Sequence, residues 1–170
     1  MWHFTGKERP DFAEEPGPGQ ESVWDYPRPP ALDPSAEHVV VEANGVRLAE
    51  TRNSIRVLET AGPPTYYIPE RDIDWQHLVA ISQRSFCEWK GQASYFALAG
   101  DSREQAVAWL YANPAKAYDA IDRHVSFYPG RVACFVNGER VEPQPGEFYG
   151  GWITSRVVGP FKGEPGTSHW

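Results

Sequence analysis

One turn near the middle of the chain concentrates side chains that can do chemistry. Residues 85–95, with the sequence SFCEWKGQASY, place a thiol, a carboxylate, an indole, an amine and a phenol around a single glycine. A cysteine thiolate is a strong nucleophile, and Lys90 would favour the thiolate of Cys87 if both side chains face one cavity. The segment therefore predicts a pocket rather than a plain strand, with Cys87 as nucleophile or redox thiol. The alternative is that Cys87, like Cys134 in its apolar run, packs as a small apolar side chain.

Glu59 is the second candidate for chemistry. It ends a strand-like segment and is followed by a rigid Pro-Pro turn, so its carboxylate can be held firmly enough to orient a substrate or to act as a base. An exposed salt-bridge partner is the alternative. On an extended strand Arg56 faces one side and Glu59 the other. We expect Cys87, Glu59 and Lys90 to form the catalytic group if the protein is an enzyme.

Aromatic residues indicate what such a pocket would bind. Trp109 and Tyr111 share one strand face, and aromatic walls hold flat or cationic ligands through stacking and cation–π contacts. Tyr66 and Tyr67 must face opposite sides of an extended strand, so at most one of them lines a given pocket. The alternative is that these rings form an ordinary core. We expect six residues to contact a ligand: Arg56, Tyr66, Trp89, Tyr95, Trp109 and Tyr128.

Three other motifs carry less information. The triplet Phe161-Lys162-Gly163 repeats the pattern Trp89-Lys90-Gly91, and two such turns can each present an amine to an anion, although two ordinary turns are the alternative. His124 is of a residue type that can act as an acid or a base, but it has no assigned partner. No phosphate loop, Gly-x-Ser-x-Gly elbow or Gly-x-Gly-x-x-Gly fingerprint is present, and we expect no cofactor.

Charge and cysteine content narrow the classes of partner. Residues 1–37 carry eight acidic and three basic side chains, whereas residues 38–170 carry fifteen and thirteen. The body is therefore nearly neutral and lacks the basic face that a phosphate backbone requires, so nucleic acid is not an expected partner. The two cysteines cannot form a disulfide scaffold, and no Cys-x-x-Cys or His-x-x-x-His spacing supports a zinc site. We expect no metal.

The expected compartment is the bacterial cytoplasm. The first residues run directly into charged positions without an apolar targeting segment, and no apolar run reaches the roughly 18 residues that a membrane span needs. We therefore expect a soluble protein with reduced thiols and no membrane partner.

Four segments organise the chain. Residues 1–22 are expected to be a flexible acidic leader, because their composition cannot bury enough apolar surface to offset the entropy of ordering. Residues 23–37 combine Trp and Tyr with a polyproline-like stretch, which predicts a stiff arm lying in a groove; a solvated linker is the alternative. Residues 38–145 form the β-rich core, and residues 146–170 a Gly/Pro/aromatic tail that packs on it.

The core is predicted to be mainly β, with curved or two-layered antiparallel sheets and one or two short helices. Asn44-Gly45 and Asn137-Gly138 each separate strand-like runs, which is a strong hairpin signal because both turn residues take positive φ. Further strands are expected at residues 54–59, 65–68, 93–99, 107–111 and 124–128. Helices are expected at residues 72–79 and 114–122.

These segments together resemble the bacterial family known as domain of unknown function 427. The resemblance runs from about residue 23 to the C-terminus, and the tail is similar to that of the longer, actinobacterial-type members. The matching residues are Trp24–Pro30, Leu58–Thr60, Pro63–Pro69, Cys87–Gly91, Ala108-Trp109, Phe127–Arg131, Gly150–Trp152 and Gly159–Gly163.

The resemblance implies a compact β-rich fold similar to the Mss4-like or β-tent group, whose members use the cleft between sheets for ligands, metal or redox chemistry. The paired Cys-x-x-Cys motifs of the zinc-bearing members are missing here. The family also carries a nucleotidyltransferase-like label, but no adjacent acidic pair suited to two metal ions is present. The resemblance thus implies a fold and a site, not an activity.

Three functions remain open from the sequence. The first is a module that binds a small molecule in an aromatic, charged cleft. The second is an enzyme that uses Cys87, activated by Lys90 and with Glu59 as base. The third is an interaction protein whose aromatic arm and tail bind a second copy, giving a homodimer.

Overall fold

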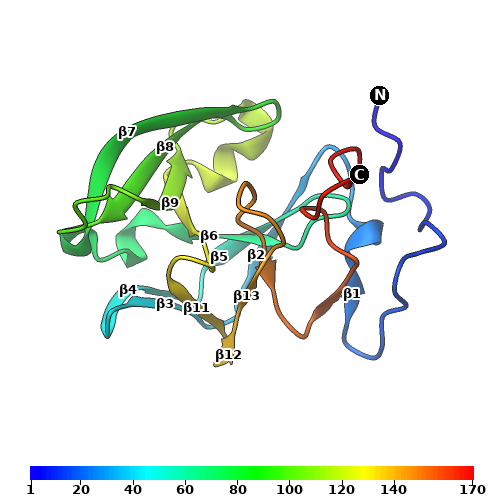
Figure 1. Ribbon diagram of the computed structural model, residues 1–170, viewed down its shortest axis with the longest axis horizontal. Helices are drawn as coiled ribbons and strands as arrows, with labels where there is room; N and C mark the ends of the chain where they lie inside the picture. Colours follow the sequence, from blue (N-terminus) through cyan, green and yellow to red (C-terminus); the bar gives the residue numbers. More distant parts are fainter.

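Two antiparallel sheets form the body of the protein (Figure 1). The computed structural model describes all 170 residues. The larger sheet has seven strands in the spatial order β2 (Ala31–Ser35), β5 (Ser54–Leu58), β6 (Thr65–Pro69), β10 (His124–Phe127), β9 (Ala106–Tyr111), β8 (Gly91–Leu98) and β7 (Leu78–Cys87). The smaller sheet has the order β12 (Glu139–Arg140), β11 (Ala133–Val136), β3 (Val39–Ala43) and β4 (Val46–Thr51). The prediction of a mainly β fold with antiparallel sheets is confirmed.

Two small strand pairs attach the ends of the chain to this body. Strand β1 (Glu21–Ser22) pairs in parallel with β15 (Val157–Val158), and β13 (Glu142–Pro143) pairs with β14 (Trp152–Ile153). The first pair joins segments that are more than 130 residues apart in the sequence, so the N-terminal and C-terminal parts lie side by side at one end of the molecule (Figure 1).

Both Asn-Gly hairpins are present. Asn44 and Gly45 connect β3 to β4 with φ values of 52° and 75°, and Asn137 and Gly138 connect β11 to β12 with φ values of 50° and 80°. Positive φ at two successive residues is the requirement that made Asn-Gly predictive. These hairpins build the smaller sheet.

The helical predictions are less accurate. The prediction of a helix at residues 72–79 is wrong. The region contains two single 3₁₀ turns, η2 (Glu70–Asp72) and η3 (Trp75–His77), and β7 then begins at Leu78. The second expected helix is the 3₁₀ segment η4 (Lys116–Ile121), which is kinked at Tyr118. A further turn, η1 (Val23–Asp25), lies in the arm.

Strand β7 corrects the interpretation of residues 85–95. The strand-like backbone continues through Cys87, whose register partner across the hairpin is Gly91, and only residues 88–90 form the turn. Most side chains of β7 are exposed because it is the outer strand of its sheet, so the sequence shows no alternation of apolar and polar residues. The segment is therefore a β-hairpin that also borders a cavity.

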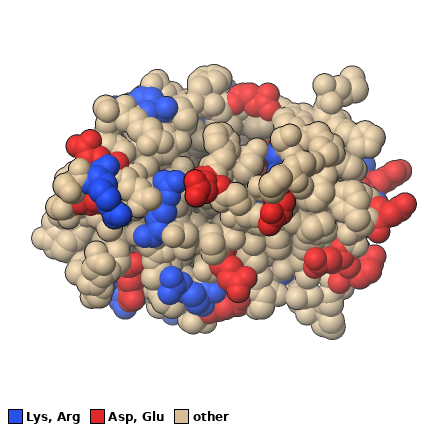
Figure 2. Space-filling view, viewed as in Figure 1, with Lys and Arg blue, Asp and Glu red and all other residues tan.

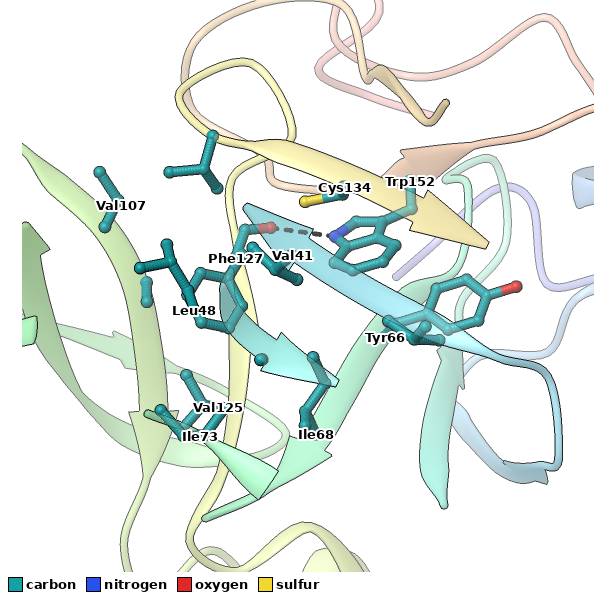
Figure 3. Packing of buried hydrophobic residues seen from close by; sticks show 14 of the residues in the cluster. Val41, Leu48, Tyr66, Ile68, Ile73, Val107, Val125, Phe127, Cys134 and Trp152 are labelled. Carbon is teal, nitrogen blue, oxygen red and sulfur yellow. Dashed lines mark hydrogen bonds between the residues drawn. The ribbon is translucent and has the colours of Figure 1, made fainter. Parts of the chain in front are cut away.

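Apolar side chains fill the space between the two sheets (Figure 3). Val39, Val41 and Cys134 from the smaller sheet meet residues of β6, β9 and β10 from the larger one. Trp152 is fully buried there, stacks on Tyr66 at 5.0 Å between ring centroids, and donates a hydrogen bond from Nε1 to the carbonyl of Phe127 at 2.9 Å (Figure 3). The tail thus supplies a core residue.

The opposite face of the larger sheet is also buried. Tyr67, Trp109 and Tyr111 pack there with Tyr118 and Ile121 of η4. Tyr66 belongs to the core between the sheets whereas Tyr67 belongs to this second cluster, as the alternation of a strand requires. The second cluster carries the candidate site.

A third cluster joins the arm to the tail. Trp24 is fully buried, its ring meets Phe4, Phe12 and Trp170 at 5.1–5.2 Å between centroids, and its Nε1 donates to the carbonyl of Pro160. Arg28 donates hydrogen bonds to the carbonyls of Phe4 and Trp170. Residues of the leader therefore contact the arm and the tail, while the expected flexibility of residues 1–22 stays a prediction.

Candidate functional site

A cavity of about 470 Å³ lies over the second aromatic cluster. The β5–β6 region and strand β9 contribute to its wall, together with the β7–β8 hairpin. A loop at residues 144–151 lines it too, and Trp2 and Lys162 are added by the two ends of the chain. The cavity is therefore built from the body and completed by segments that precede and follow it.

All three residues of the expected catalytic group line this cavity. Cys87 ends β7 with a half-buried thiol, Lys90 lies in the hairpin turn with a buried side chain, and Glu59 follows β5. The carboxylate of Glu59 accepts a hydrogen bond from Nε of Arg28 at 3.4 Å, so it is already paired with a cation. The structure brings the three groups to one cavity, and their catalytic role stays a prediction.

Four of the six expected ligand-binding residues also line the cavity: Trp89, Tyr95, Trp109 and Tyr128. Hydrogen bonds fix the polar atoms of two of them, Trp109 and Tyr95. Trp109 donates from Nε1 to the hydroxyl of Tyr67 at 3.1 Å, and the hydroxyl groups of Tyr95 and Ser85 lie 2.6 Å apart. Burial raises the pKa of Tyr67 and Tyr128, so these phenols are neutral hydrogen-bonding groups at physiological pH.

Two glycines let the 144–151 loop approach the aromatic wall. A Cβ on Gly150 would overlap the Trp109 ring, and a Cβ on Gly151 would overlap Gln144 and Pro63. The backbone of Gly151 is fixed by the Gln144 side chain, whose Oε1 accepts from the Gly151 N–H at 3.1 Å. Glycine is therefore required at this close approach of loop and cavity wall.

Two exposed phenylalanines mark the edge of the cavity. Phe86 on β7 is 79% exposed and Phe148 in the loop is 81% exposed. A single large apolar side chain on a protein surface is common, but these two border the same cavity. The opening is thus apolar on two sides.

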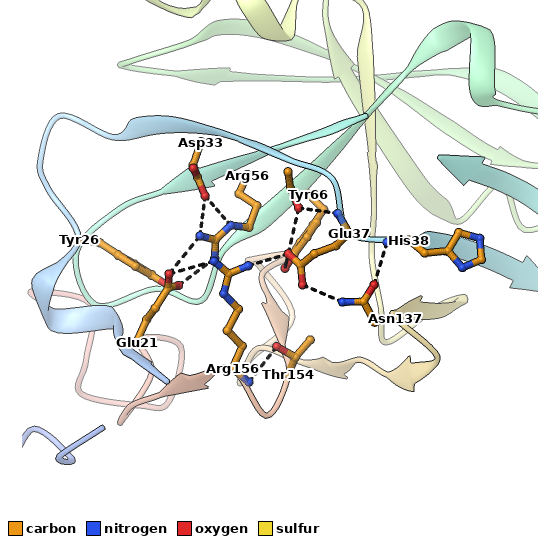
Figure 4. A network of polar contacts seen from close by, with 11 residues as sticks. Glu21, Tyr26, Asp33, Glu37, His38, Arg56, Tyr66, Asn137, Thr154 and Arg156 are labelled. Carbon is orange, nitrogen blue, oxygen red and sulfur yellow. Dashed lines mark hydrogen bonds and ion pairs between the residues drawn. The ribbon is translucent and has the colours of Figure 1, made fainter. Parts of the chain in front are cut away.

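Arg56 and Tyr66, unlike the other four expected residues, do not line the cavity, and their contact with a ligand stays a prediction. Arg56 is buried on the other face of β5, where its guanidinium group binds the carboxylates of Glu21 and Asp33 (Figure 4). The hydroxyl of Tyr66 donates to Glu37 at 3.1 Å. The physical reason is strand alternation: Val57 and Glu59 face the cavity, so Arg56 faces away.

The network around Arg56 joins the arm, the larger sheet and the tail (Figure 4). Glu21 accepts hydrogen bonds from Arg56 and Tyr26, and Arg156 of the tail bridges Glu21 and Glu37. Burial opposes ionisation of Glu21, but the hydrogen bonds from Arg56 and Tyr26 outweigh it and lower the pKa to about 2. This network is structural: it holds the segments that complete the cavity.

Sequence reasoning missed several residues of the cavity wall. Tyr67 lines it in place of Tyr66, and Arg131, Trp2 and residues 144–151 were not expected there. Strand alternation predicts that Tyr66 and Tyr67 face opposite sides of the sheet. Which of them faces the cavity depends on how β6 is placed in the sheet, and the sequence does not show this. Lys162 was noted only for its aromatic-Lys-Gly pattern, and this pattern was the available signal.

Other sequence candidates lie outside the cavity. The Nδ1 atom of His124 lies 3.0 Å from the backbone oxygen of Asp122. Cys134 is fully buried in the core, where burial raises the pKa of its thiol. The chain contains no group of three or more His, Cys, Asp or Glu side chains arranged to hold a metal ion.

The surface is mixed in charge. Acidic and basic side chains are interspersed over the viewed face, with acidic groups gathered at the end where the N-terminal segment lies (Figures 1 and 2). No helix has both the length and the apolar character to cross a membrane.

Comparison with known families assigns the body of the protein to a family. A family model described as domain of unknown function 427 matches residues 31–138. No curated protein matches the chain. The matched region covers more than half of the sequence and contains the larger sheet and every strand of the smaller one except β12, and the chain belongs to this family.

Proposed function

We propose that this member of the domain of unknown function 427 family binds a small planar organic molecule in the cavity beside the β7–β8 hairpin. The observation that carries the proposal is the composition of the wall: Trp89, Trp109 and several tyrosines surround one cavity of about 470 Å³. Such a volume is within the range of small-molecule sites, which combine aromatic walls with a few fixed polar groups. The tyrosine hydroxyls and Ser85 supply those groups.

Fluorescence titration with phenylnaphthylamine, a neutral planar probe, tests this proposal. Wild type should give a saturable increase in emission, since the probe becomes bright in an apolar site. Trp89→Ala removes one ring of the wall without removing a hydrogen bond and should weaken binding by about tenfold, corresponding to about 1.4 kcal/mol.

Phe135→Ala is the matched control for this experiment. Phe135 is also partly buried, but it lies on β11 in the smaller sheet and does not line the cavity. Its removal should leave the affinity unchanged. A non-saturable signal, or equal effects of the two substitutions, would contradict binding in the cavity.

A second candidate function is an enzyme that uses Cys87. The observation that favours it is a half-buried free thiol on the wall of a cavity that Lys90 and Glu59 also line. A functional thiolate reacts with iodoacetamide faster than an unstructured thiol near neutral pH. If Cys87 reacts no faster than a cysteine in an unfolded peptide, the enzyme hypothesis loses its support.

Self-association through the arm and tail is a weaker proposal. Trp24 is fully buried within its own chain and Tyr26 nearly so, and both therefore lack the surface that binding to a second copy needs. A dimer that disappears on removal of residues 1–37 would support it, and sedimentation of the whole chain as a monomer at all concentrations would dispose of it.

A further inference from the structure

Lys90 is a buried cation that the rest of the protein leaves unpaired. The residue is 9% exposed and lines the cavity. Its ammonium group lies 5.6 Å from the centroid of the Tyr111 ring, and no hydrogen bond or ion pair joins it to another group of the chain. The side chain is enclosed by the protein, while the ammonium group itself keeps contact with the cavity, because it is not among the fully buried atoms that lack a partner. An anion that enters with the ligand would supply the partner that the chain does not provide.

The fold holds Lys90 in this position. The hairpin turn ends at Gly91, which has φ 104°, and the carbonyl of Lys90 accepts a hydrogen bond from the N–H of Ala115 at 3.2 Å. The backbone of the turn is thereby tied to the segment before η4. From this turn the side chain of Lys90 lies in the cavity wall, with its amine over the Tyr111 ring.

Lys162 is a second buried amine on the same cavity wall. It is 7% exposed, and its Nζ donates to a main-chain oxygen of Trp170 at 3.1 Å. Burial lowers its pKa, and the positive charge of Arg28 acts in the same direction. The two aromatic-Lys-Gly turns of the sequence therefore meet at one site, from elements far apart in the chain.

The acidic residues that line the cavity do not neutralise the positive charge of these two lysines. Glu59 is paired with Arg28, and Glu88 and Glu147 are exposed. The buried charges that lack an acidic partner are thus positive, while the unpaired negative charges face water, where solvent screens them. An anionic group is favoured at the buried part of the cavity.

We propose that Lys90 binds the acidic group of a planar aromatic ligand, so that the ligand class is a singly charged aromatic acid. Lys162 and Arg131 also line the cavity, but each donates to a main-chain oxygen, so Lys90 is the cation left without an acceptor and one negative charge matches it. The rings of Trp89 and Trp109 offer the apolar surface that an aromatic ligand needs. This inference rests on the proposed function, because it names the ligand class of the same cavity. It assigns Lys90 to binding rather than to activation of Cys87.

A matched pair of probes tests the assignment. Anilinonaphthalene sulfonate carries one negative charge, and phenylnaphthylamine has the same aromatic skeleton without it. Wild type should bind the sulfonate at least about tenfold more tightly, as expected for a charge-assisted contact in a desolvated site. Lys90→Met should abolish this preference while leaving the affinity for the neutral probe unchanged.

Two further variants keep the test decisive. Lys116→Met changes the net charge equally but alters an exposed residue outside the cavity, so it should preserve the preference. If Lys90→Met binds neither probe, Lys90→Arg decides: a retained preference supports the assignment and a lost one overturns it. Failure of both probes on wild type would refute the proposed function, whereas equal binding of both would refute only the role of Lys90.

Discussion

Replacing Glu21 with glutamine should destabilise the protein in a pH-dependent manner. Glu21, at the end of the leader, accepts a hydrogen bond from Tyr26 of the arm and pairs with Arg56 of the sheet and Arg156 of the tail. The lowering of its pKa from 4.5 to about 2 corresponds to about 3 kcal/mol of stability. Its side chain is 31% exposed, and solvent screening reduces the expected contribution to about 2 kcal/mol.

The sign of the effect follows from the direction of the shift. Because folding lowers the pKa, the stabilisation is fully present above pH 4.5 and is lost as the pH falls towards about 2. Urea denaturation followed by tryptophan fluorescence should show Glu21→Gln less stable than wild type by about 2 kcal/mol at pH 7, with the difference shrinking to near zero at the acidic end.

Glu8→Gln is the control for this prediction, because Glu8 is an exposed leader residue. It should leave the unfolding free energy within about 0.5 kcal/mol of wild type. If Glu21→Gln lowers stability equally at all pH values, or by no more than Glu8→Gln, the account of the network is refuted.

Three further outcomes are expected. In the native protein a thiol reagent should label the half-buried Cys87 and spare Cys134, whose thiol is fully buried and has a raised pKa; equal labelling of both without denaturant would contradict the burial. Trp152→Ala should lower the unfolding free energy by about 3–5 kcal/mol in urea titrations, because it leaves a void in the core, and a loss near zero would show that the tail is not part of that core. Gly163→Ala should lower the melting temperature more than Gly166→Ala does. Both glycines have positive φ, but only at Gly163 would a Cβ overlap the backbone of the 144–151 region. Similar decreases in melting temperature would speak against that close approach.

Local sequence signals predicted most of the sheets because their causes are local. Asn44-Gly45 and Asn137-Gly138 require positive φ at both positions, and few residues other than Asn and Gly accept it. The alternation of Tyr66 and Tyr67 likewise follows from the geometry of any strand. Strand β7 was missed because most of its successive side chains are exposed, on both faces of the strand. Its sequence therefore has no apolar periodicity to detect.

The composition of the site depended on long-range contacts that the sequence does not display. Trp2, the 144–151 loop and Lys162 reach the cavity only because the two ends of the chain pair with each other and pack on the body. Arg56 lies outside the cavity wall although its strand face was read correctly, because the position of a pocket relative to a strand is a tertiary property. The cluster of chemistry-bearing groups around Lys90 was the part that the sequence could predict.

The segments outside the family match complete the cavity. The match covers residues 31–138, whereas Trp2, residues 144–151 and Lys162 lie on either side of it. The ion network around Glu21 and the aromatic cluster around Trp24 hold these segments against the body. Properties of the proposed ligand site are therefore expected to depend on the ends of the chain as well as on the matched domain.

The most direct measurement uses the seven indole N–H signals of the protein in a two-dimensional NMR spectrum. Trp2, Trp89 and Trp109 line the cavity, and the other four tryptophans do not. Titration with anilinonaphthalene sulfonate should shift the signals of these three in a saturable manner and leave those of the other four nearly unchanged. Shifts spread over all seven signals, or none on Trp89 and Trp109 at saturation, would contradict binding in this cavity.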